Sequence, residues 1–309
     1  GIACEEGRLG EVDAFKKKSR WEAVHRTVSA AKGNREVSVS AVCSRAGMSR
    51  ANYYACRRQR RARKVDEDLI LSLVRGERQV HPRLGGRKLL HVLREDLEAN
   101  GVRVGRDRLF DILSAHGLLV ESTRARARTT NSRHSLPVYH NLVAEMTLYE
   151  ANQAWAADLT YVRTKEGFMY GALITDMHSR KIVGSFIGDS LEATGCVKAL
   201  DVALSGLPAG KHPVHHSDRG CQYCCHLYVD RLNGRALPVS MTEVLHCYEN
   251  AMAERVNGIL KQEYGLGRDF QTKAQAVAVF KQAVYLYNLR RPHLSLDYQT
   301  PAEVHVRAA

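Results

Sequence analysis

The chain has 309 residues, of which 44% are hydrophobic and 26% charged, so it holds enough apolar material for two or three folded domains. No apolar run is long enough to suggest a membrane span, and the N-terminus from Gly1 lacks the basic and apolar regions of a secretory signal. The net charge of +13 is uneven: residues 1–135 hold 29 Lys and Arg against 16 Asp and Glu, and residues 136–309 hold 17 of each. This asymmetry predicts a basic front part that faces a polyanion and a near-neutral part with another task.

Residues 1–64 are predicted to form a basic helical region that contains a helix-turn-helix. Two short helical patterns within residues 38–54 are broken at Ala46-Gly47, and Ser49 is placed to cap the second helix. Residues 57–64 then carry six cations in eight positions, enough to neutralise several phosphates without reading base sequence. The expected DNA contacts here are Arg57, Arg58, Arg60 and Arg61. The alternative is a solvated helix face that carries charge.

Residues 65–120 predict a second helix-turn-helix segment. Apolar residues recur at helical spacing from Leu89 to Leu97, and the pattern stops at Asn100-Gly101. A second apolar stripe runs from Leu109 to Leu113. The cations expected to contact DNA in this segment are Arg87, Arg103 and Arg106. Helical hairpins are common and most bind no DNA, so the tandem arrangement and the excess of positive charge carry this prediction.

Residues 121–145 are interpreted as a basic linker between the two parts of the chain. Residues 122–133 show little apolar periodicity and are rich in Ser, Thr and Arg. Such a segment can track a phosphate backbone through Arg124, Arg126 and Arg128, or it can be a solvated tether only.

Residues 146–309 predict a mixed sheet with helices on its faces. Three runs rich in β-branched and aromatic residues form an antiparallel meander, and two further strands then alternate with helices. The predicted strands are residues 154–162, 168–175, 181–187, 213–217 and 237–241, and the predicted helices are 191–204, 222–233 and about 250–264. This order is that of ribonuclease-H-like folds. The expected fold class is therefore α+β and multidomain, with an N-terminal helical helix-turn-helix region followed by a ribonuclease-H-like mixed α/β catalytic core.

Three acids fall at positions of this core that can converge. Asp158 lies within the first strand, Asp218 directly follows the fourth, and Glu254 lies on the late helix, with 35 residues between the second and third acids. An acid inside an apolar strand is costly unless it is paired or binds a cation, and carboxylates with room for water and phosphate suit Mg²⁺ or Mn²⁺. Two such ions can support an in-line phosphoryl displacement. Taken singly, each acid is more commonly a turn, cap or solvated residue.

Two further residues share the face of Glu254. Asn257 and Lys261 follow it at three and seven positions, so both are expected near the site, with Lys261 on DNA phosphates. A different metal site is conceivable at Cys221, Cys224 and Cys225, because Cys221 and Cys224 have the spacing of a zinc knuckle. The second knuckle is missing, and ordinary thiols in a reducing compartment are the preferred interpretation.

The three acids resemble the Asp-Asp-Glu triad of transposases and retroviral integrases. The surrounding motifs are similar to those of the second-frame, OrfB-type transposases of insertion-sequence family three. The motifs are His216-Ser-Asp-Arg-Gly-Cys-Gln-Tyr223, Glu249-Asn-Ala-Met-Ala-Glu254 with Lys261, Tyr287-Asn-Leu-Arg-Arg-Pro-His293 with Thr300-Pro301, and the segment from Gly85 to Leu119. The resemblance covers nearly the whole chain. It departs from the family at the three cysteines and at residues 244–247, in the loop before the catalytic helix.

The resemblance implies metal-dependent DNA cleavage at terminal inverted repeats and strand transfer by the freed 3′-hydroxyl. Asp158, Asp218 and Glu254 would be the catalytic metal ligands, and two Mg²⁺ or Mn²⁺ ions the cofactor. The implied partners are double-stranded DNA of the element ends and target, a first-frame OrfA product or fusion, and further protomers on the DNA. The start at Gly1 would fit a fragment of such a fusion or an expression boundary. The expected location is the cytoplasm, at the bacterial nucleoid, with no membrane partner.

Three other functions stay open from the sequence. A catalytically silent, transposon-derived DNA-binding protein would have the basic front part but no need for three acids and Lys261. A ribonuclease-H-like nuclease would share the core but would produce no joined strands. Zinc-dependent chemistry would show as stoichiometric zinc in the purified protein.

Overall fold

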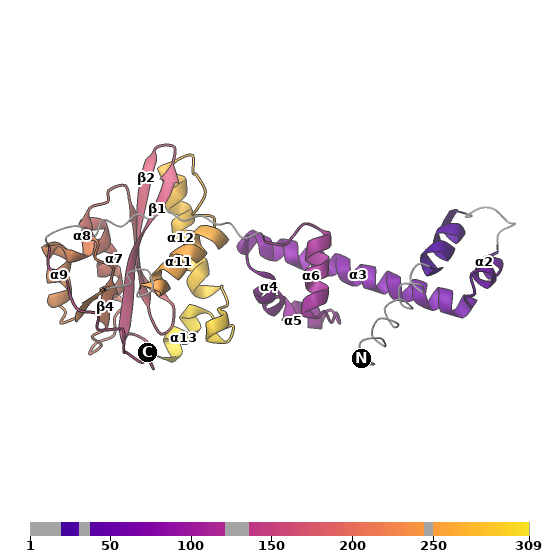
Figure 1. Ribbon diagram of the computed structural model, residues 1–309, viewed down its shortest axis with the longest axis horizontal. Coiled ribbons are helices and arrows are strands. Elements are labelled where there is room, and N and C mark those ends of the chain that lie inside the picture. The colour runs from indigo at the N-terminus through magenta and orange to yellow at the C-terminus, as the bar shows by residue number, and fades with distance from the viewer. Residues whose placement is uncertain (1–19, 31–37, 121–135, 244–249, 309) are drawn as a thin grey trace, which may run out of the picture. The chain divides into compact units, whose positions relative to one another are not determined.

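The computed structural model of the protein describes residues 20–30, 38–120, 136–243 and 250–308 (Figure 1). The chain divides into two compact units, Gly1–Ser72 and Leu73–Ala309. This division lies within helix α3 (Arg50–Val80), and so does the boundary at residues 64 and 65 that the sequence suggested. The charge pattern changes near residue 64, but the helix continues through that change.

The first unit is helical, and its chain turns where the sequence predicts. Residues 20–30 are helical, α2 (Val39–Arg45) follows, and Gly47 takes a φ of +62° before α3 begins at Arg50. Ser49 caps α3, since its Oγ accepts a hydrogen bond of 3.2 Å from the Asn52 amide. A small core of Trp21, Val24, Cys43 and Tyr53 holds these helices together. That this turn is a DNA-binding motif stays a prediction.

Helix α3 is much longer than the short helices expected before residue 64. It spans 31 residues and includes the whole basic run. No proline interrupts it, and its one glycine, Gly76, lies near its end. The cations of residues 57–64 are therefore spaced at helical intervals along a single rigid element.

In the second unit, a helical segment that we define as residues 73–120 precedes the sheet. After the end of α3 it contains α4 (Gly86–Val92), α5 (Arg94–Ala99) and α6 (Arg106–Ala115). The predicted apolar stripes are buried at Leu89, Leu97 and Leu109, among others, although the expected single helix is divided at Leu93. At Gly86, a Cβ atom would lie 2.8 Å from the Phe110 ring, so this position needs glycine for α4 to pack on α6.

The sheet has five strands in the order β3-β2-β1-β4-β5. They are β1 (Ala154–Thr164), β2 (Gly167–Asp176), β3 (Ile182–Gly188), β4 (Val214–Ser217) and β5 (Val239–Met241). The first three form the predicted antiparallel meander, and β4 and β5 run parallel to β1. This mixed sheet with β1 at its centre is the ribonuclease-H-like arrangement that the sequence predicted.

Helices cover both faces of the sheet. One core packs α7 (Ala193–Ser205), α8 (Cys221–Cys224) and α9 (His226–Asn233) against buried residues of β1 and β2. The other packs α11 (Ala251–Glu263) and α12 (Lys273–Leu289), and the two sets lie on opposite sides of the strands in Figure 1. The predicted helix over 222–233 is divided at Cys225, whose ψ is 149°. The short helix η1 (Leu294–Leu296) and α13 (Pro301–Arg307) complete the unit.

Part of the expected linker belongs to the core. The Leu142 amide donates to Ser240 Oγ at 2.9 Å, the Asn141 amide donates to Glu243 at 2.9 Å, and Leu136 and Tyr139 pack against the α7 side. The expected DNA contacts Arg124, Arg126 and Arg128 lie outside the described residues. Among the helices that the structure describes, none is both long and apolar enough for a membrane crossing.

Close packing of β3 against α7 makes Gly184 a sensitive position. A Cβ atom there would overlap the Ala199 carbonyl oxygen and lie 2.8 Å from Ala203 Cβ, so Gly184→Ala should lower the free energy of unfolding by about 1–3 kcal/mol. Gly76→Ala, in an exposed turn of α3 with open space around it, should instead stabilise by about 0.5–1 kcal/mol. Thermal denaturation of the two variants measures both effects, and equal effects would contradict this packing.

Candidate active site

The fold brings the three acids to neighbouring elements. Asp158 lies in the middle of β1, and Asp218 directly follows β4, which pairs with β1 in parallel register from Ala154 to Ala157. Glu254 lies in the first turn of α11, which packs beside β1. Asp158 and Asp218 are half-buried and Glu254 is exposed. The fold therefore places the elements that carry the three acids next to one another, and the roles of the acids stay a prediction.

Two asparagines, one before Glu254 in the sequence and one after it, form hydrogen bonds that link α11 to β1. Asn257 Nδ2 donates to Asp158 Oδ2 at 2.7 Å, and Asn250 Nδ2 donates to the Ala157 carbonyl at 3.2 Å. Positions 250, 254, 257 and 261 recur at helical spacing, so the asparagines, Glu254 and Lys261 share one face of α11. The amide of Leu159 donates to the other oxygen of Asp158 at 2.8 Å. The carboxylate of Asp158 is thus held in one orientation.

The acids are close enough to change one another's protonation. Burial, followed by the charge of Asp218, raises the pKa of Asp158 from 3.8 to about 7, and Glu254 adds to the rise. Burial and Asp218 also raise the pKa of Glu254. Burial lowers the pKa of Lys261, and the charge of Asp158 partly opposes that change. Three acids and one lysine therefore belong to one electrostatic site.

The turn after β4 fixes the second acid. Asp218 Oδ1 accepts a hydrogen bond of 3.0 Å from the Gly220 amide, and Arg219 Nε donates to the Thr242 carbonyl at 2.6 Å, which ties this turn to the residue after β5. A Cβ at Gly220 would lie 3.0 Å from Asp218 Oδ1, so the turn is tight at this glycine. The charge of Asp218 also contributes to a raised pKa of Tyr161.

The donor chemistry of the site fits a hard divalent cation. Its ligand atoms are carboxylate oxygens whose mutual repulsion a cation would relieve, and Asn257 adds a buried Oδ1 that has no hydrogen-bond partner among the described residues. Within the same residues, no three His, Cys, Asp or Glu side chains lie together at metal-binding distance. The three acids therefore do not form a closed metal-binding group among the described residues.

The cysteines next to the site form no metal centre among the described residues. Cys224 is buried with its Sγ 3.6 Å from Met241 Sδ, and the Cys225 thiol lies 3.2 Å from the Gln222 carbonyl. Cys221 is exposed. Burial raises the pKa of Cys224 to about 11, which disfavours the thiolate that zinc requires. Cys224 is therefore packed as a buried thiol, and an ordinary thiol is what the sequence favoured at this position.

Two of the expected DNA contacts have partners within the protein. The Arg60 guanidinium lies 3.9 Å from the centre of the Trp21 ring and 3.6 Å from Glu22, so it serves the core of the first unit. Asn257 is 7% exposed and its amide is committed to Asp158. The sequence placed both residues correctly on their helices but could not identify these partners.

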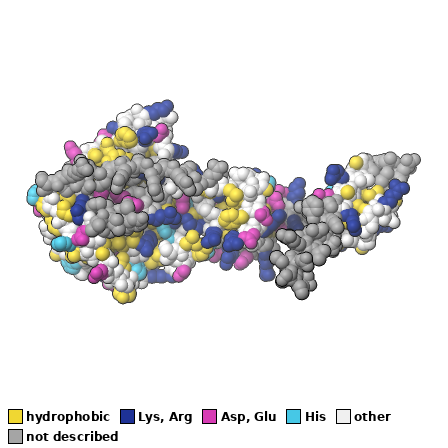
Figure 2. Space-filling model, viewed as in Figure 1, with side chains coloured by type: hydrophobic (Ala, Val, Ile, Leu, Met, Phe, Trp, Pro, Cys, Tyr) yellow, Lys and Arg dark blue, Asp and Glu magenta, His cyan; other side chains and the backbone are white. Residues whose placement is uncertain are grey.

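Of the other described cations expected on DNA, Lys261 is half-buried and the six that precede the core are exposed. Arg57, Arg58 and Arg61 line a hollow on α3 with Tyr54, which is 39% exposed. Arg87, Arg103 and Arg106 are also exposed, and Arg106 Nε lies 2.8 Å from Asp107. On the face drawn in Figure 2, Lys and Arg side chains over α4–α6 lie among Asp and Glu side chains. The strongest described clustering of cations is therefore that on α3.

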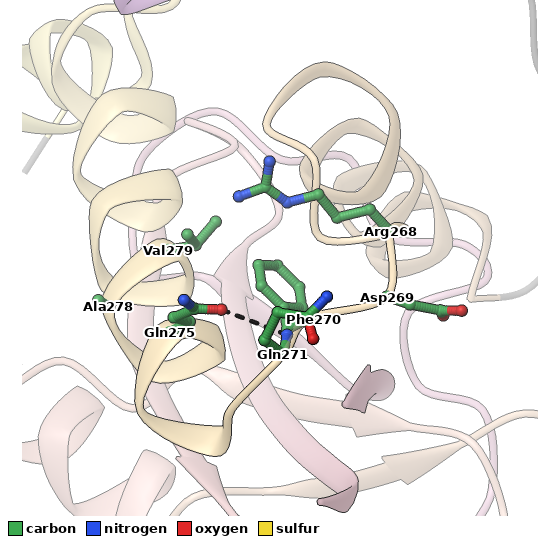
Figure 3. A pocket seen from close by; sticks show the side chains of 7 residues that line it. All are labelled: Arg268, Asp269, Phe270, Gln271, Gln275, Ala278 and Val279. Carbon is green, nitrogen blue, oxygen red and sulfur yellow. Dashed lines mark hydrogen bonds between the residues drawn. The ribbon is translucent and has the colours of Figure 1, made fainter. Parts of the chain in front are cut away.

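A second hollow lies at the start of α12 and contains none of the three acids. It lies over the Phe270 ring, and the Arg268 guanidinium is 4.9 Å from the centre of that ring (Figure 3). The Gln275 side chain accepts a hydrogen bond of 3.2 Å from the Gln271 amide across its floor. Its lining residues are Arg268, Asp269, Phe270, Gln271, Gln275, Ala278 and Val279. This hollow is open and has no reactive group, so it is not the candidate active site.

Comparisons with known proteins place the core in a family. Residues 149–247 match one family model described as an integrase core domain, and residues 235–301 match a second model with the same description. Both matches include parts of the region that carries the three acids. Among solved structures, the chain is similar to the HTLV-2 integrase catalytic core domain in complex with magnesium, with 17% identity, 50% of this chain and 96% of that chain covered, and a TM-score of 0.40.

Three relatives match most of the chain. It is 36% identical over 269 residues to the insertion element IS600 31 kDa protein of Shigella sonnei, which covers 84% of this chain and 96% of the relative. It is 31% identical to the transposase for IS629 of Shigella sonnei, over 87% of this chain and 91% of the relative. It is 30% identical to transposase InsF for IS3A of Escherichia coli K12, over 84% and 90%. With these relatives and an integrase-type core, the chain belongs to the IS3 family of insertion-sequence transposases.

Proposed function

We propose that this chain cleaves DNA at the ends of its insertion sequence and joins the freed 3′-hydroxyl to another phosphodiester at a site formed by Asp158, Asp218 and Glu254. One observation carries the assignment: Asp158, inside the central strand, has its pKa raised to about 7 by burial, Asp218 and Glu254, while Asn257 holds its carboxylate. A strand that keeps an acid at such electrostatic cost is typical of a functional site.

The three acids would hold one or two divalent cations, Mg²⁺ or Mn²⁺. The support for a cation is the donor set of the chain itself, because the three carboxylates repel one another. When bound, such ions supply Lewis-acid stabilisation of the attacking and leaving oxygens of a phosphoryl transfer. The chain's part is to orient the carboxylates, which Asn257 does for Asp158 and the Gly220 amide for Asp218.

The reaction consists of two balanced displacements at phosphorus. In the first, water forms a bond to phosphorus, the bond to the 3′ oxygen breaks, and that oxygen leaves as a 3′-hydroxyl. In the second, this hydroxyl attacks another phosphodiester and a different 3′ oxygen leaves. Lys261 shares the α11 face of Glu254, and its half-buried ammonium would hold a phosphate oxygen beside the acids.

DNA would be held by the basic front part, and the active assembly would contain more than one protomer. Exposed Arg57, Arg58 and Arg61 lie on α3 beside the exposed Tyr54, a combination that suits a phosphate backbone. The proposed DNA partners are the terminal inverted repeats and the target, and the further proposed partner is a first-frame OrfA product. The proposed location is the bacterial cytoplasm, at the nucleoid.

The alternatives are distinguished by products. A silent DNA-binding protein has no use for three mutually repelling carboxylates, and two of the three relatives reported above are named transposases. A nuclease of the same fold would release cut strands only. Labelled element-end DNA incubated with the protein and Mg²⁺ or Mn²⁺, with cut and joined strands resolved, tests the proposal. Cut strands without joined ones would contradict it.

Replacement of one acid should remove the chemistry and leave DNA binding. Asp218→Asn should lower strand cleavage by at least about a thousandfold, because a lost carboxylate ligand removes several kcal/mol of transition-state stabilisation. The dissociation constant for end DNA should stay within about threefold, since most of the proposed phosphate contacts lie in the basic front part. Asp201→Asn is the matched control, since that acid forms an exposed ion pair with Arg231. Cleavage retained by Asp218→Asn would reject the assignment.

The raised pKa of Asp158 predicts how stability changes with pH. Folding raises this pKa from 3.8 to about 7, so the folded state binds the proton more tightly and the ionised group destabilises the fold. Its penalty is absent below pH 4, grows as the pH rises towards 7, and is at most ~4 kcal/mol above that. Asp158→Asn should therefore raise the melting temperature in EDTA at pH 8 and hardly at pH 4.

Mg²⁺ provides the complementary measurement. At pH 8 it should raise the melting temperature of the wild type, because a bound cation compensates the ionised acids, and it should have a much smaller effect on Asp158→Asn. Equal Mg²⁺ effects on both proteins would show that the ion binds elsewhere.

The cations of α3 should determine the salt dependence of DNA binding. Arg57→Gln with Arg61→Gln should reduce the slope of log K against log salt by about 2, since each lost phosphate contact accounts for about 0.9. Arg235→Gln with Lys281→Gln is the control, because both residues are exposed cations of the core. A slope that is unchanged in the first variant, or equally reduced in the control, would remove α3 from the binding surface.

A further inference from the structure

The C-terminal end of α11 is held by a buried ionic cluster outside the candidate active site. Glu263, the last residue of α11, accepts two hydrogen bonds from Arg291, Nε to Oε2 at 2.8 Å and Nη2 to Oε1 at 2.7 Å. Lys88 of α4 donates to the same Oε1 at 3.2 Å. The side chains of Arg291 and Lys88 are 2% and 12% exposed. A cation from the helical segment thus reaches the helix that carries Glu254.

The charges of this cluster make Lys88 the unusual member. Burial alone would raise the pKa of Glu263. Arg291 and, to a smaller extent, Lys88 lower this pKa below its usual value. Burial and the nearby Arg291 lower the pKa of Lys88. The bidentate pair of Glu263 and Arg291 already satisfies both carboxylate oxygens. Lys88 is therefore not needed to neutralise Glu263. Burial of the Lys88 ammonium costs free energy, and the charge of Glu263 does not explain it.

Two more contacts join the helical segment to the same part of the core. His81 Nδ1 lies 3.1 Å from the hydroxyl of Tyr264, the residue directly after α11, and the two rings meet edge to face. The His91 ring stacks on Tyr298 at a centroid distance of 4.5 Å. His81 therefore contacts Tyr264, Lys88 contacts Glu263, and His91 contacts Tyr298. We call these three contacts the α11 dock.

Lys88 of the α11 dock is next in sequence to an exposed cation of α4. Arg87, next to Lys88 on α4, is exposed, so the first turn of α4 has one cation towards solvent and one towards α11. Glu254 and Glu263 are nine residues apart on α11, about 13 Å along a rigid helix. A shift of α4 would therefore act through Glu263 on Lys261 in the same last turn of α11, and along the helix on Glu254 and Asn257 in its first two turns.

We propose that Lys88 is a positioning residue, through which DNA on the helical segment sets the placement of α11 at the active site. This inference rests on the proposed function. Because a misplacement of about 1 Å at a reacting centre can cost about a hundredfold in rate, a single ion pair at the far end of α11 is sufficient to separate a productive from an unproductive site. The contact makes cleavage depend on end DNA being bound by the helical segment.

The test replaces the buried charge and keeps the shape. Lys88→Met retains the unbranched side chain, Lys88→Arg restores a cation, and Lys281→Met on an exposed position of α12 is the control. Four quantities are measured with Mg²⁺ or Mn²⁺: the dissociation constant for duplex with the terminal inverted repeat, kcat and KM for its cleavage, and the rate of nicking of random duplex. The melting temperature of each variant is measured beside them. Lys88→Met should lower kcat on end DNA by about tenfold to a hundredfold. The same variant should stay near wild type in KM, dissociation constant, random nicking and melting temperature. Lys88→Arg should recover the kcat of the wild type.

Each other result overturns the inference. A parallel loss of end cleavage, random nicking and melting temperature would make Lys88 a structural residue only. A weakened dissociation constant with unchanged kcat would make it a phosphate contact, and an unchanged kcat on end DNA would leave it without a role in positioning. A wild-type protein that cleaves no DNA would instead overturn the proposed function, and the inference with it, so the two failures are distinguishable.

Discussion

The repulsion among three carboxylates around β1 is the constraint on which the rest of the core depends. Asp158 lies in the central strand, where burial and Asp218 raise its pKa to about 7, so these surroundings favour a proton over a negative charge. The sheet order places β4 beside β1 and therefore Asp218 beside Asp158, and α11 adds Glu254 from one face. Such an arrangement gains nothing for stability, and it supports the proposal that the acids bind a cation.

Helix α11 connects the chemistry to the remainder of the second unit. Its first two turns carry Glu254 and Asn257 towards β1, and its last residue, Glu263, is fixed by Arg291 and Lys88. A carboxylate at the C-terminal end of a helix is disfavoured by the helix dipole, and the bidentate pair with Arg291 offsets this cost. A helix fixed at both ends presents its acids with little freedom, which favours a phosphoryl transfer that relies on placement of charge.

Local patterns were sufficient to predict the strands and most helices, and the position of the acids along them. Alternation and β-branched content located β1 to β5, and helical spacing located α11 with Glu254 in its first turn. Contacts between distant residues were not predictable: Asn257 meets Asp158 across 99 positions, and Lys88 meets Glu263 across 175. The continuation of α3 to Val80 was missed because the change of charge near residue 64 indicated a boundary, while helix propensity carries the helix onward.

The uneven distribution of charge explains why positioning through the α11 dock would be useful. The basic front part carries the whole excess of positive charge, and such charge attracts any duplex regardless of its sequence. If proximity of DNA were sufficient for cleavage, the same excess would make the chain an indiscriminate nuclease. The core is near-neutral, and Lys88 of the helical segment contacts the end of α11. This arrangement makes the attraction of DNA and the cleavage of DNA depend on different residues. Attraction then depends on many exposed cations, whereas reaction depends on the placement of a few buried groups, which only the correct complex achieves.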